Sequence, residues 1–215
     1  MDGPAGVGKS TVAKQLASRL GYRYIDTGAL YRAVAWKVTH SQVDPSNHTA
    51  VSALLPSTRI TLEHDHESPR VCVDQQDVTR DIRTSEISRT ASVVSALPSV
   101  RDWLLPIQRQ MGSDGRVVME GRDIGTCVFP GADVKFFLDA DVEVRAKRRH
   151  HELTTAGQAA ALDRTRHDIA LRDTRDRSRE LSPLAPAADA HLIDTSVLEV
   201  AQVVDRMLAI VASKL

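Results

Sequence analysis

The chain has 215 residues, 42% hydrophobic and 26% charged, a composition typical of a folded protein and not of a disordered one. Lysine plus arginine and aspartate plus glutamate both total 28, and this zero net charge argues against a nucleic-acid binder held by bulk charge. Arginine supplies 22 of the basic residues, and its planar fork suits phosphate and carboxylate groups. The length suggests one main domain over 1–215, with an inserted or mobile subdomain.

Signals for membranes, export and structural metals are missing from the sequence. No apolar run approaches the roughly 20 residues that cross a bilayer, and no basic segment followed by an apolar one opens the chain. Cys72 and Cys127 fit no metal-ligand spacing, which favours a reducing compartment. We therefore expect a cytoplasmic protein, a monomer, with no membrane or nucleic-acid partner.

Helix and strand patterns alternate along most of the chain. Apolar residues at fourfold spacing predict a helix over 9–20, which Gly21 ends, and a second helix from Thr27. Further helices are predicted over 85–96, 99–111, 141–151, 157–179 and 197–213, and strands over 22–25, 116–120, 132–139 and 190–194. We read 43–49 as a loop and 154–157 as a link between two charged helices. The alternation predicts an α/β domain with a mainly parallel sheet.

Residues 58–82 follow another pattern. The segments 58–63 and 70–74 alternate with period two around a turn at His66–Pro69, and a third short strand is expected at 77–79. The pattern predicts a small antiparallel meander inserted between helices.

The strongest motif is a P-loop, G-x-x-x-x-G-K-[ST]. It comprises Gly3, Pro4, Ala5, Gly6, Val7, Gly8, Lys9, Ser10 and Thr11. Glycines let backbone N–H groups cradle phosphates, and the helix that follows adds its positive end. Lys9 would reach the β- and γ-phosphates of a nucleotide at an exposed ligand site, and the Ser10 hydroxyl would bind Mg²⁺.

A buried strand normally leads into a P-loop, yet only Met1 and Asp2 precede Gly3. A strand of about six residues would bury three or four aliphatic side chains, worth on the order of 5–10 kcal/mol. Whole domains are stable by only about 5–15 kcal/mol. We therefore expect the natural protein to begin several apolar residues upstream, with its start codon assigned too late.

Several protein classes carry a P-loop. GTPases read guanine with an N-K-x-D element, but the single asparagine, Asn47, is followed by His48. Motors are usually larger and need a partner-coupling surface that the sequence does not reveal. A small-molecule kinase is left, together with a regulatory nucleotide-binding protein without turnover.

Two further segments place arginines after strands. DTGALYR, residues 26–32, and EGRDIGT, residues 120–126, both follow a predicted strand. Ligands of open α/β sheets bind at the carboxyl ends of strands, and Arg32 or Arg122 could grip a phosphate with two parallel hydrogen bonds. Two such segments facing a P-loop favour a second anionic ligand.

The predicted helical hairpin is rich in arginine. Arg172, Asp176 and Arg179 share a helix face by spacing, and Arg145, Arg148 and Arg149 do likewise on the preceding helix. Taken alone, such a hairpin reads as a solvated, salt-bridged surface. Beside a P-loop it suits a lid, because phosphoryl transfer between nucleotides gathers negative charges that arginines offset.

Four segments together resemble the bacterial cytidylate kinase family of nucleoside monophosphate kinases. They are GPAGVGKST, YIDTGALYRAVA, EGRDIGTCVFPGADVKFFLDA and RDTRDRSRELSPLAPAADAHLIDTS. The resemblance covers nearly the whole chain and implies the P-loop NTPase fold, with helices flanking a five-stranded parallel core sheet. It implies a core over 1–32, 97–145 and 180–215, a monophosphate-binding subdomain over 33–96 with the insert 58–82, and a lid over 146–179.

The resemblance also implies residue roles. Lys9, Arg122 and Arg179 would be catalytic, and the 3–11 loop would bind ATP. The residues implied in CMP binding are Thr27, Arg32, Ser92, Arg101, Arg122, Asp123, Arg172, Asp176 and Arg179. Glu120 stands where relatives carry a carboxylate, often Asp, that holds Mg²⁺ through water. The implied reaction is ATP plus CMP or dCMP giving ADP plus CDP or dCDP; kinases acting on UMP, AMP or a non-nucleotide acceptor are the alternatives.

Overall fold

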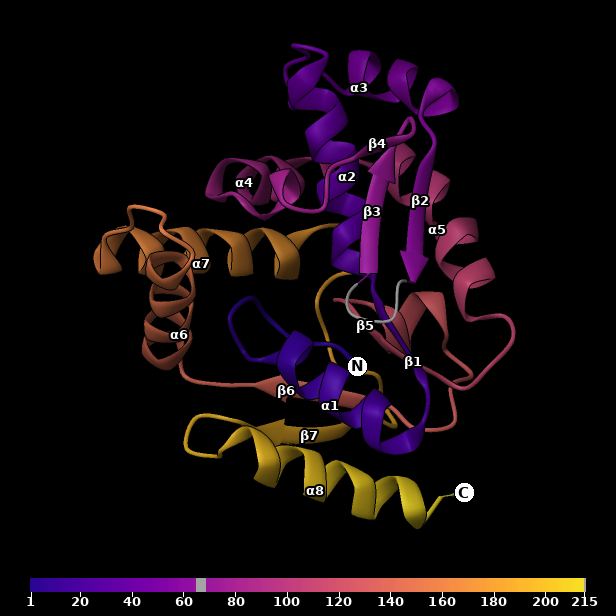
Figure 1. Ribbon diagram of the computed structural model, residues 1–215, viewed down its shortest axis with the longest axis vertical. Coiled ribbons are helices and arrows are strands. Elements are labelled where there is room, and N and C mark those ends of the chain that lie inside the picture. The colour runs from indigo at the N-terminus through magenta and orange to yellow at the C-terminus, as the bar shows by residue number, and fades with distance from the viewer. Residues whose placement is uncertain (65–68, 215) are drawn as a thin grey trace. The chain divides into compact units, whose positions relative to one another are not determined.

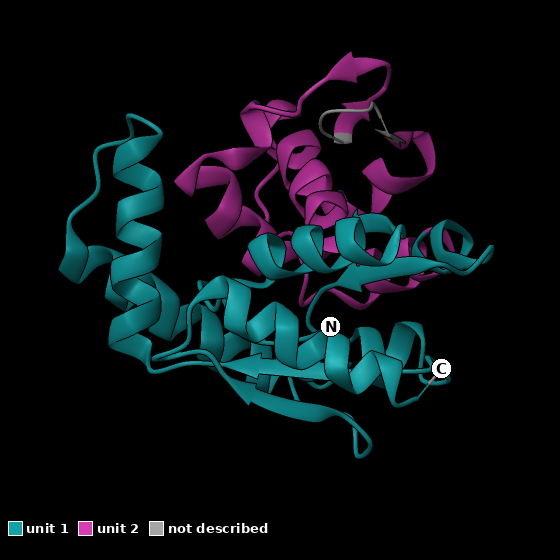
Figure 2. Cartoon of the chain, turned by 60° about the horizontal axis from the view of Figure 1, so that its bottom comes forward, with its two compact units in different colours: residues 1–26, 108–215 teal, residues 27–107 magenta. Residues whose placement is uncertain are grey.

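The computed structural model describes residues 1–64 and 69–214, which form two compact units (Figure 2). Unit 1 comprises Met1–Asp26 and Gln108–Leu215, and unit 2 comprises Thr27–Ile107. These units follow the packing of the chain. The core, monophosphate-binding and lid boundaries expected above are functional boundaries, and they stay a prediction.

Unit 1 is built on parallel strands (Figure 1). β1 (Arg23–Asp26) pairs with β5 (Val117–Glu120), and β6 (Phe136–Asp139) pairs with β7 (His191–Asp194). In this register Asp26 stands opposite Glu120, and Asp139 stands opposite Asp194. Each strand thus ends on a carboxylate, and the predicted α/β class with parallel pairing is confirmed.

Met1 and Asp2 lie between the two strand pairs. The Gly121 N–H donates to the Met1 carbonyl at 3.0 Å, and the Asp2 N–H donates to the Phe136 carbonyl at 2.8 Å. The Leu138 N–H returns a bond to the Asp2 carbonyl at 2.8 Å. Among its described residues, unit 1 therefore has four paired strands, with residues 1–2 in the place of the fifth strand that the resemblance implies. The expectation about an upstream segment stays a prediction.

Helices complete unit 1. α1 (Lys9–Leu20) begins directly after the P-loop and ends at Gly21, whose φ of 65° is left-handed. It packs against α8 (Val200–Ala212), and α6 (Val142–Thr155) packs against α7 (Leu162–Ser178). The core joins residues of α1, β6, β7 and α8, among them Val12, Leu16, Phe136, Leu138, Ile193, Val204 and Met207. A π-helix, η3 (Ile124–Val128), follows β5.

Unit 2 contains the antiparallel meander. β2 (Ile60–His64), β3 (Pro69–Val73) and β4 (Gln76–Asp77) pair in that order. Around it lie α2 (Thr27–His40), α3 (His48–Leu54), η1 (Leu55–Ser57), η2 (Asp81–Arg83) and α4 (Ser85–Val94), with α5 (Pro98–Gly112) running on into unit 1. α2 packs against α4, η2 and β3. The meander is confirmed; of its predicted turn at His66–Pro69, residues 66–68 lie outside the described residues.

Several predicted boundaries were wrong. α6 continues to Thr155 and α7 starts only at Leu162, so the link is 156–161 and not 154–157; Gly157, with φ 72°, turns the chain there. α3 begins inside the predicted loop 43–49, because the Asn47 side chain caps it by accepting the Ala50 N–H at 3.1 Å. β6 is half as long as predicted, and α8 begins at a capping box formed by Glu199 and Gln202.

Across the described ranges, no helix combines the length and the hydropathy needed to cross a membrane.

Candidate active site

The P-loop has the backbone that its glycines permit. Gly6 and Gly8 have φ values of 75° and 95°, in the region that favours glycine. A Cβ on Gly6 would lie 2.9 Å from the Arg145 carbonyl oxygen, and one on Gly3 would lie 2.1 Å from that of Leu138. The loop leads straight into the N-terminus of α1, where free N–H groups and the helix dipole favour an anion. The predicted loop and helix are confirmed.

Lys9 turns back onto this loop. Its Nζ donates to the Gly3 carbonyl at 2.8 Å and to the Pro4 carbonyl at 2.6 Å, and only 7% of the residue is exposed. The ligand site was expected to be exposed, but the Lys9 side chain itself is buried, because these carbonyls hold the ammonium inside the loop. Burial, and next the positive charges of Arg122 and Arg172, lower the pKa of Lys9. The negative charges of Glu120 and Asp2 oppose this shift without cancelling it.

Glu120 ends β5 at this site and is 3% exposed. Burial, followed by the negative charge of Asp26, raises the pKa of Glu120. The Tyr24 hydroxyl donates to Glu120 Oε1, and the Ser10 hydroxyl is a further hydrogen-bond partner of the same carboxylate. Tyr24 was not among the predicted site residues, although its place two residues before Asp26 in β1 puts it on the same strand face.

These oxygen atoms fit a magnesium ion. Mg²⁺ prefers hard oxygen ligands and binds through one or two carboxylates together with phosphates. Ser10 and Glu120 supply a hydroxyl and a carboxylate side by side. A cation there would relieve the repulsion between Glu120 and Asp26 that raises the Glu120 pKa. The predicted metal-binding pair is therefore brought together.

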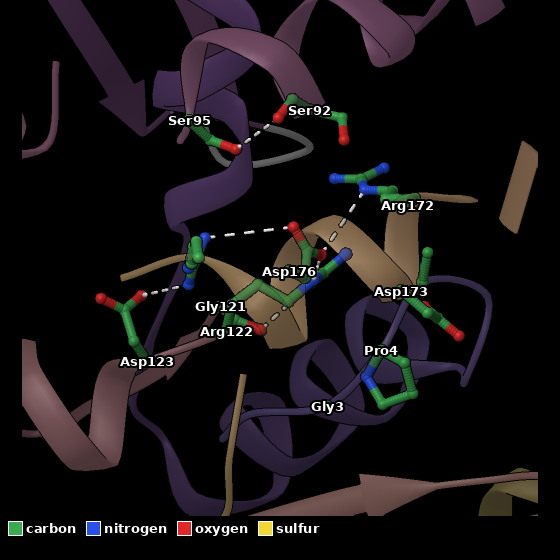
Figure 3. Close-up of polar contacts among 12 residues, drawn as sticks. Gly3, Pro4, Ser92, Ser95, Gly121, Arg122, Asp123, Arg172, Asp173 and Asp176 are labelled. Atoms are coloured by element: carbon green, nitrogen blue, oxygen red, sulfur yellow. Dashed lines mark hydrogen bonds and ion pairs between the residues drawn. The ribbon is translucent and has the colours of Figure 1, made fainter. Parts of the chain in front are cut away.

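Asp176 gathers three arginines (Figure 3). Its Oδ2 lies 3.0 Å from Arg122 Nε and 3.8 Å from Arg172 Nε, and its Oδ1 lies 4.0 Å from Arg179 Nη1. Burial would raise the pKa of Asp176, but the three guanidiniums outweigh burial and hold that pKa below its usual value. Asp123 joins the cluster, with Oδ1 4.0 Å from Arg179 Nη2. Unit 1 thus assembles five of the predicted CMP-binding residues.

The backbone around Arg179 differs from the prediction. Arg179 is not on a helix face with Arg172 and Asp176, because α7 ends at Ser178 and Arg179 is extended, with φ −66° and ψ 141°. Its Nε donates to the Ser182 carbonyl at 2.6 Å. The chain also folds back through Leu184, whose N–H donates to the Asp176 carbonyl at 2.7 Å. Arg179 therefore reaches the cluster from the loop after the helix.

The three arginines of α6 have separate partners. Arg145 donates to the Ala140 carbonyl at 2.9 Å and to the Ala5 carbonyl of the P-loop at 3.1 Å, and it pairs with Asp173 at 2.7 Å. Arg148 Nη2 donates to the Thr195 carbonyl at 2.6 Å. Arg149 pairs on the surface with Glu152 at 2.8 Å.

Two of these contacts tie α6 to the P-loop. Arg145 reaches Ala5 directly, whereas Arg148 acts through Thr195, whose hydroxyl donates to the Val7 carbonyl at 3.1 Å. Asp173 and Thr195 were not among the predicted site residues. Asp173 stands inside the RDTRD segment, so a charged residue facing the site could have been found there.

Unit 2 carries the other predicted residues. Thr27 opens α2 and is 2% exposed, and Arg32 lies in the second turn of the same helix. Ser92 in α4 is 3% exposed, and its hydroxyl has no hydrogen-bond partner among the described residues. Arg101 in α5 donates to the Ser95 carbonyl at 3.2 Å, and its guanidinium carbon lies 5.7 Å from the centre of the Tyr31 ring. These helices thus hold buried polar groups suited to a hydrogen-bonding ligand.

Comparison with known proteins agrees with this geometry. The family model described as "Cytidylate kinase" matches residues 1–213. The chain is 47% identical over 214 residues to a protein named cytidylate kinase from Desulfitobacterium hafniense, covering 100% of the chain and 92% of the relative. A protein of the same name from Geobacillus is 46% identical over 215 residues, with 100% and 96% covered.

A solved structure shares the fold. A crystal structure of an uncharacterized protein from Eubacterium ventriosum matches 99% of this chain and 96% of its own with a TM-score of 0.53, at 11% sequence identity. At that identity the likeness concerns the fold alone. The family model and the full-length relatives, taken together, identify this chain as a member of the cytidylate kinase family.

Proposed function

We propose that the buried cation cluster of unit 1 performs the phosphoryl transfer of this family. As a family member the chain is a (d)CMP kinase, which moves the terminal phosphoryl group of ATP to CMP or dCMP. The observation that carries the proposal is geometric. Lys9 Nζ is held on the Gly3 and Pro4 carbonyls of the P-loop at 2.8 and 2.6 Å. The guanidinium groups of Arg122, Arg172 and Arg179 all lie within 4.0 Å of the Asp176 carboxylate. Positive charges held this close together in a buried site favour a ligand with several negative charges.

The residues of the cluster have distinct tasks in the proposal. The acceptor is a phosphate oxygen of CMP, which is anionic at neutral pH, so the reaction needs no general base. Catalysis is then in-line positioning plus stabilisation of charge on the transferring group. Lys9 and the 3–11 loop bind the ATP phosphates, while Arg122 and Arg179, with Arg32, hold the CMP phosphate.

Ser10 and Glu120 would hold Mg²⁺. When bound, this ion offsets charge on the β- and γ-phosphates of ATP. The ammonium of Lys9 lies close enough to Glu120 to lower the pKa of that carboxyl. The chain's own cation and carboxylate thus counterbalance one another in the absence of substrate.

The nucleoside is assigned to the remaining residues. We propose that Ser92, Arg101 and Asp123 read the cytosine ring, where the N4 amino group is a donor that a carboxylate accepts. Arg172 and Asp176 contact the sugar, and Thr27 contributes a hydroxyl beside the acceptor phosphate. The buried, unpartnered Ser92 hydroxyl supports this assignment.

The same proposal assigns a function to each segment of the chain. Residues 33–96, with the meander 58–82, form the monophosphate-binding subdomain, and residues 146–179 form the lid. Arg145, the last core residue before the lid, fixes the start of α6 to the P-loop. A helical hairpin that is anchored there suits closure over ATP, which would exclude water. We further propose that the enzyme acts as a monomer in the cytoplasm, where its free thiols Cys72 and Cys127 stay reduced.

Paired substitutions test the cluster. Arg179→Ala removes a buried cation that lies beside Asp123 and Asp176, whereas Arg164→Ala removes an exposed one from the nearby helix α7. We expect kcat/KM for CMP to fall by about 10²-fold or more in the first variant, since hydrogen bonds between charged groups are the strong ones. The second variant should match the unmodified enzyme. Equal, small effects of both would mean that the hairpin is a solvated surface.

A further inference from the structure

The side chain of Asp2 is buried in an unusual position. It is 4% exposed, and its carboxylate accepts two successive backbone N–H groups. Oδ1 accepts from Ile124 and Oδ2 accepts from Gly125, both at 2.8 Å. These are the first two residues of the π-helix η3. The carboxylate therefore caps this helix with both of its oxygens and places a negative charge at the positive end.

Arg109 holds the other end of η3. Its Nε donates to the Val128 carbonyl at 3.2 Å and its Nη2 donates to the Cys127 carbonyl at 3.1 Å. π-Helices are rare and usually mark functional sites, because they need support from their surroundings. A carboxylate at the first residues and a guanidinium at the last ones clamp this single turn from both ends.

The clamped turn begins right after two site residues. Arg122 and Asp123 directly precede η3, and the Asp123 carbonyl accepts from Cys127 at 2.9 Å and from Val128 at 3.2 Å. The backbone of Asp123 is thus part of the same hydrogen-bonded turn. A rotation of η3 would move the Asp123 carboxylate away from Arg179, from which it lies 4.0 Å.

The backbone of Asp2 is itself fixed. It exchanges hydrogen bonds with Phe136 and Leu138 of β6, and the next residue, Gly3, opens the P-loop. Asp2 therefore joins the ATP-binding loop to the turn that carries Arg122 and Asp123. Its main chain is hydrogen-bonded to β6, and its side chain is hydrogen-bonded to η3.

We propose that Asp2 is a positioning residue for the acceptor nucleotide, which it orients through η3 without touching it. This inference rests on the proposed roles of Arg122 and Asp123 at CMP. A carboxylate suits the task because both of its oxygens accept. An asparagine would offer one acceptor, and its NH₂ group would face an N–H donor.

Asp2→Asn tests the proposal, because it keeps the shape and the main-chain bonds of the residue. We expect the KM for CMP to rise about tenfold and the KM for ATP to change by clearly less, since the altered hydrogen bonds fall on the acceptor side and Asp2 acts on Lys9 only through its charge. Asp205→Asn, which removes an exposed carboxylate paired with Arg19, is the matched control and should change neither constant. An equal rise of both KM values, or no change in either, would overturn the proposal.

One further variant and one further measurement distinguish a failure of this proposal from a failure of the proposed CMP site. Arg122→Ala should raise the KM for CMP on its own; a normal value there would overturn the proposed site instead. Amide exchange measured by NMR then decides the role of Asp2, because Ile124 or Gly125 must lose protection in the Asp2→Asn protein, and full protection of both would contradict it. If that protein does not fold, Arg109→Ala at the exposed end of η3 must give the same split between the KM values.

Discussion

Lys9→Ala should separate catalysis from stability. Lys9 makes two buried hydrogen bonds, to Gly3 and Pro4, and bonds to charged groups are each worth about 1.5–3 kcal/mol. The substitution also removes the repulsion from Arg122 and Arg172 that helps to lower the Lys9 pKa. The two effects oppose each other, so we expect the free energy of unfolding to fall by about 1–3 kcal/mol. For a chain of this length that is about 2–12 °C in Tm.

Turnover should fall much further than stability. Removing a cation aimed at the transferring phosphoryl group costs about 3–5 kcal/mol of transition-state stabilisation, or a factor of about 10²–10⁴ in kcat. The assay couples ADP release to NADH oxidation at saturating ATP and CMP, at a temperature where thermal melting shows the variant folded. Lys14→Ala is the control, because Lys14 is an exposed lysine of the same helix, 5.6 Å above the Tyr24 ring. A folded Lys9→Ala protein with near-normal turnover would refute the P-loop assignment.

Three further outcomes are expected. Asp123→Ala should reduce the preference for CMP over UMP, a preference worth several kcal/mol when a buried acceptor would face the uracil O4; an unchanged ratio of kcat/KM values would contradict the assigned role. The pKa of Asp176 is lowered in the folded protein, so its contribution to stability is fully present above about pH 3.9 and is lost as the pH falls through the native pKa. Urea unfolding between pH 5 and pH 2 should show that loss, and Asp176→Asn should remove it; identical pH slopes would argue against the ion-pair cluster. ATP binding should take up protons at alkaline pH, because phosphates raise the lowered pKa of Lys9 back toward its ordinary value; calorimetric heats that are equal in buffers of different ionisation enthalpy would exclude this.

Local patterns predicted the fold well. The helix over Lys9–Leu20 was predicted to the residue, because its apolar period and the left-handed Gly21 are both local signals. The meander was found from its period-two alternation, and the end of β5 at Glu120 was predicted from the polar residue that follows an apolar run. The first strand was predicted to end at Ile25, one residue before its observed end at Asp26. The P-loop spacing likewise predicted where glycine is required. Gly6 and Gly8 have positive φ values, and a Cβ on Gly3 or Gly6 would lie too close to a neighbouring backbone carbonyl.

Contacts between distant segments were not predictable in this way. Asp2 meets Ile124 across 122 positions, and Tyr24 meets Glu120 across 96, so neither pair leaves a periodic trace in the sequence. The end of α7 was misplaced because the charged residues continue past Ser178, while the chain turns to give the Arg179 Nε the Ser182 carbonyl. The buried state of Lys9 was missed because its partners are backbone carbonyls, whose direction depends on the folded loop.

The acceptor specificity of the purified chain is the most direct measurement. ADP release from ATP and Mg²⁺ should be followed with CMP, dCMP, UMP and AMP in turn, each over a full concentration range. CMP and dCMP should give the highest kcat/KM values, with UMP well below them, because the Asp123 carboxylate accepts from the cytosine amino group. Equal kcat/KM values for CMP and UMP, or no ADP release above background with any monophosphate, would contradict a (d)CMP kinase.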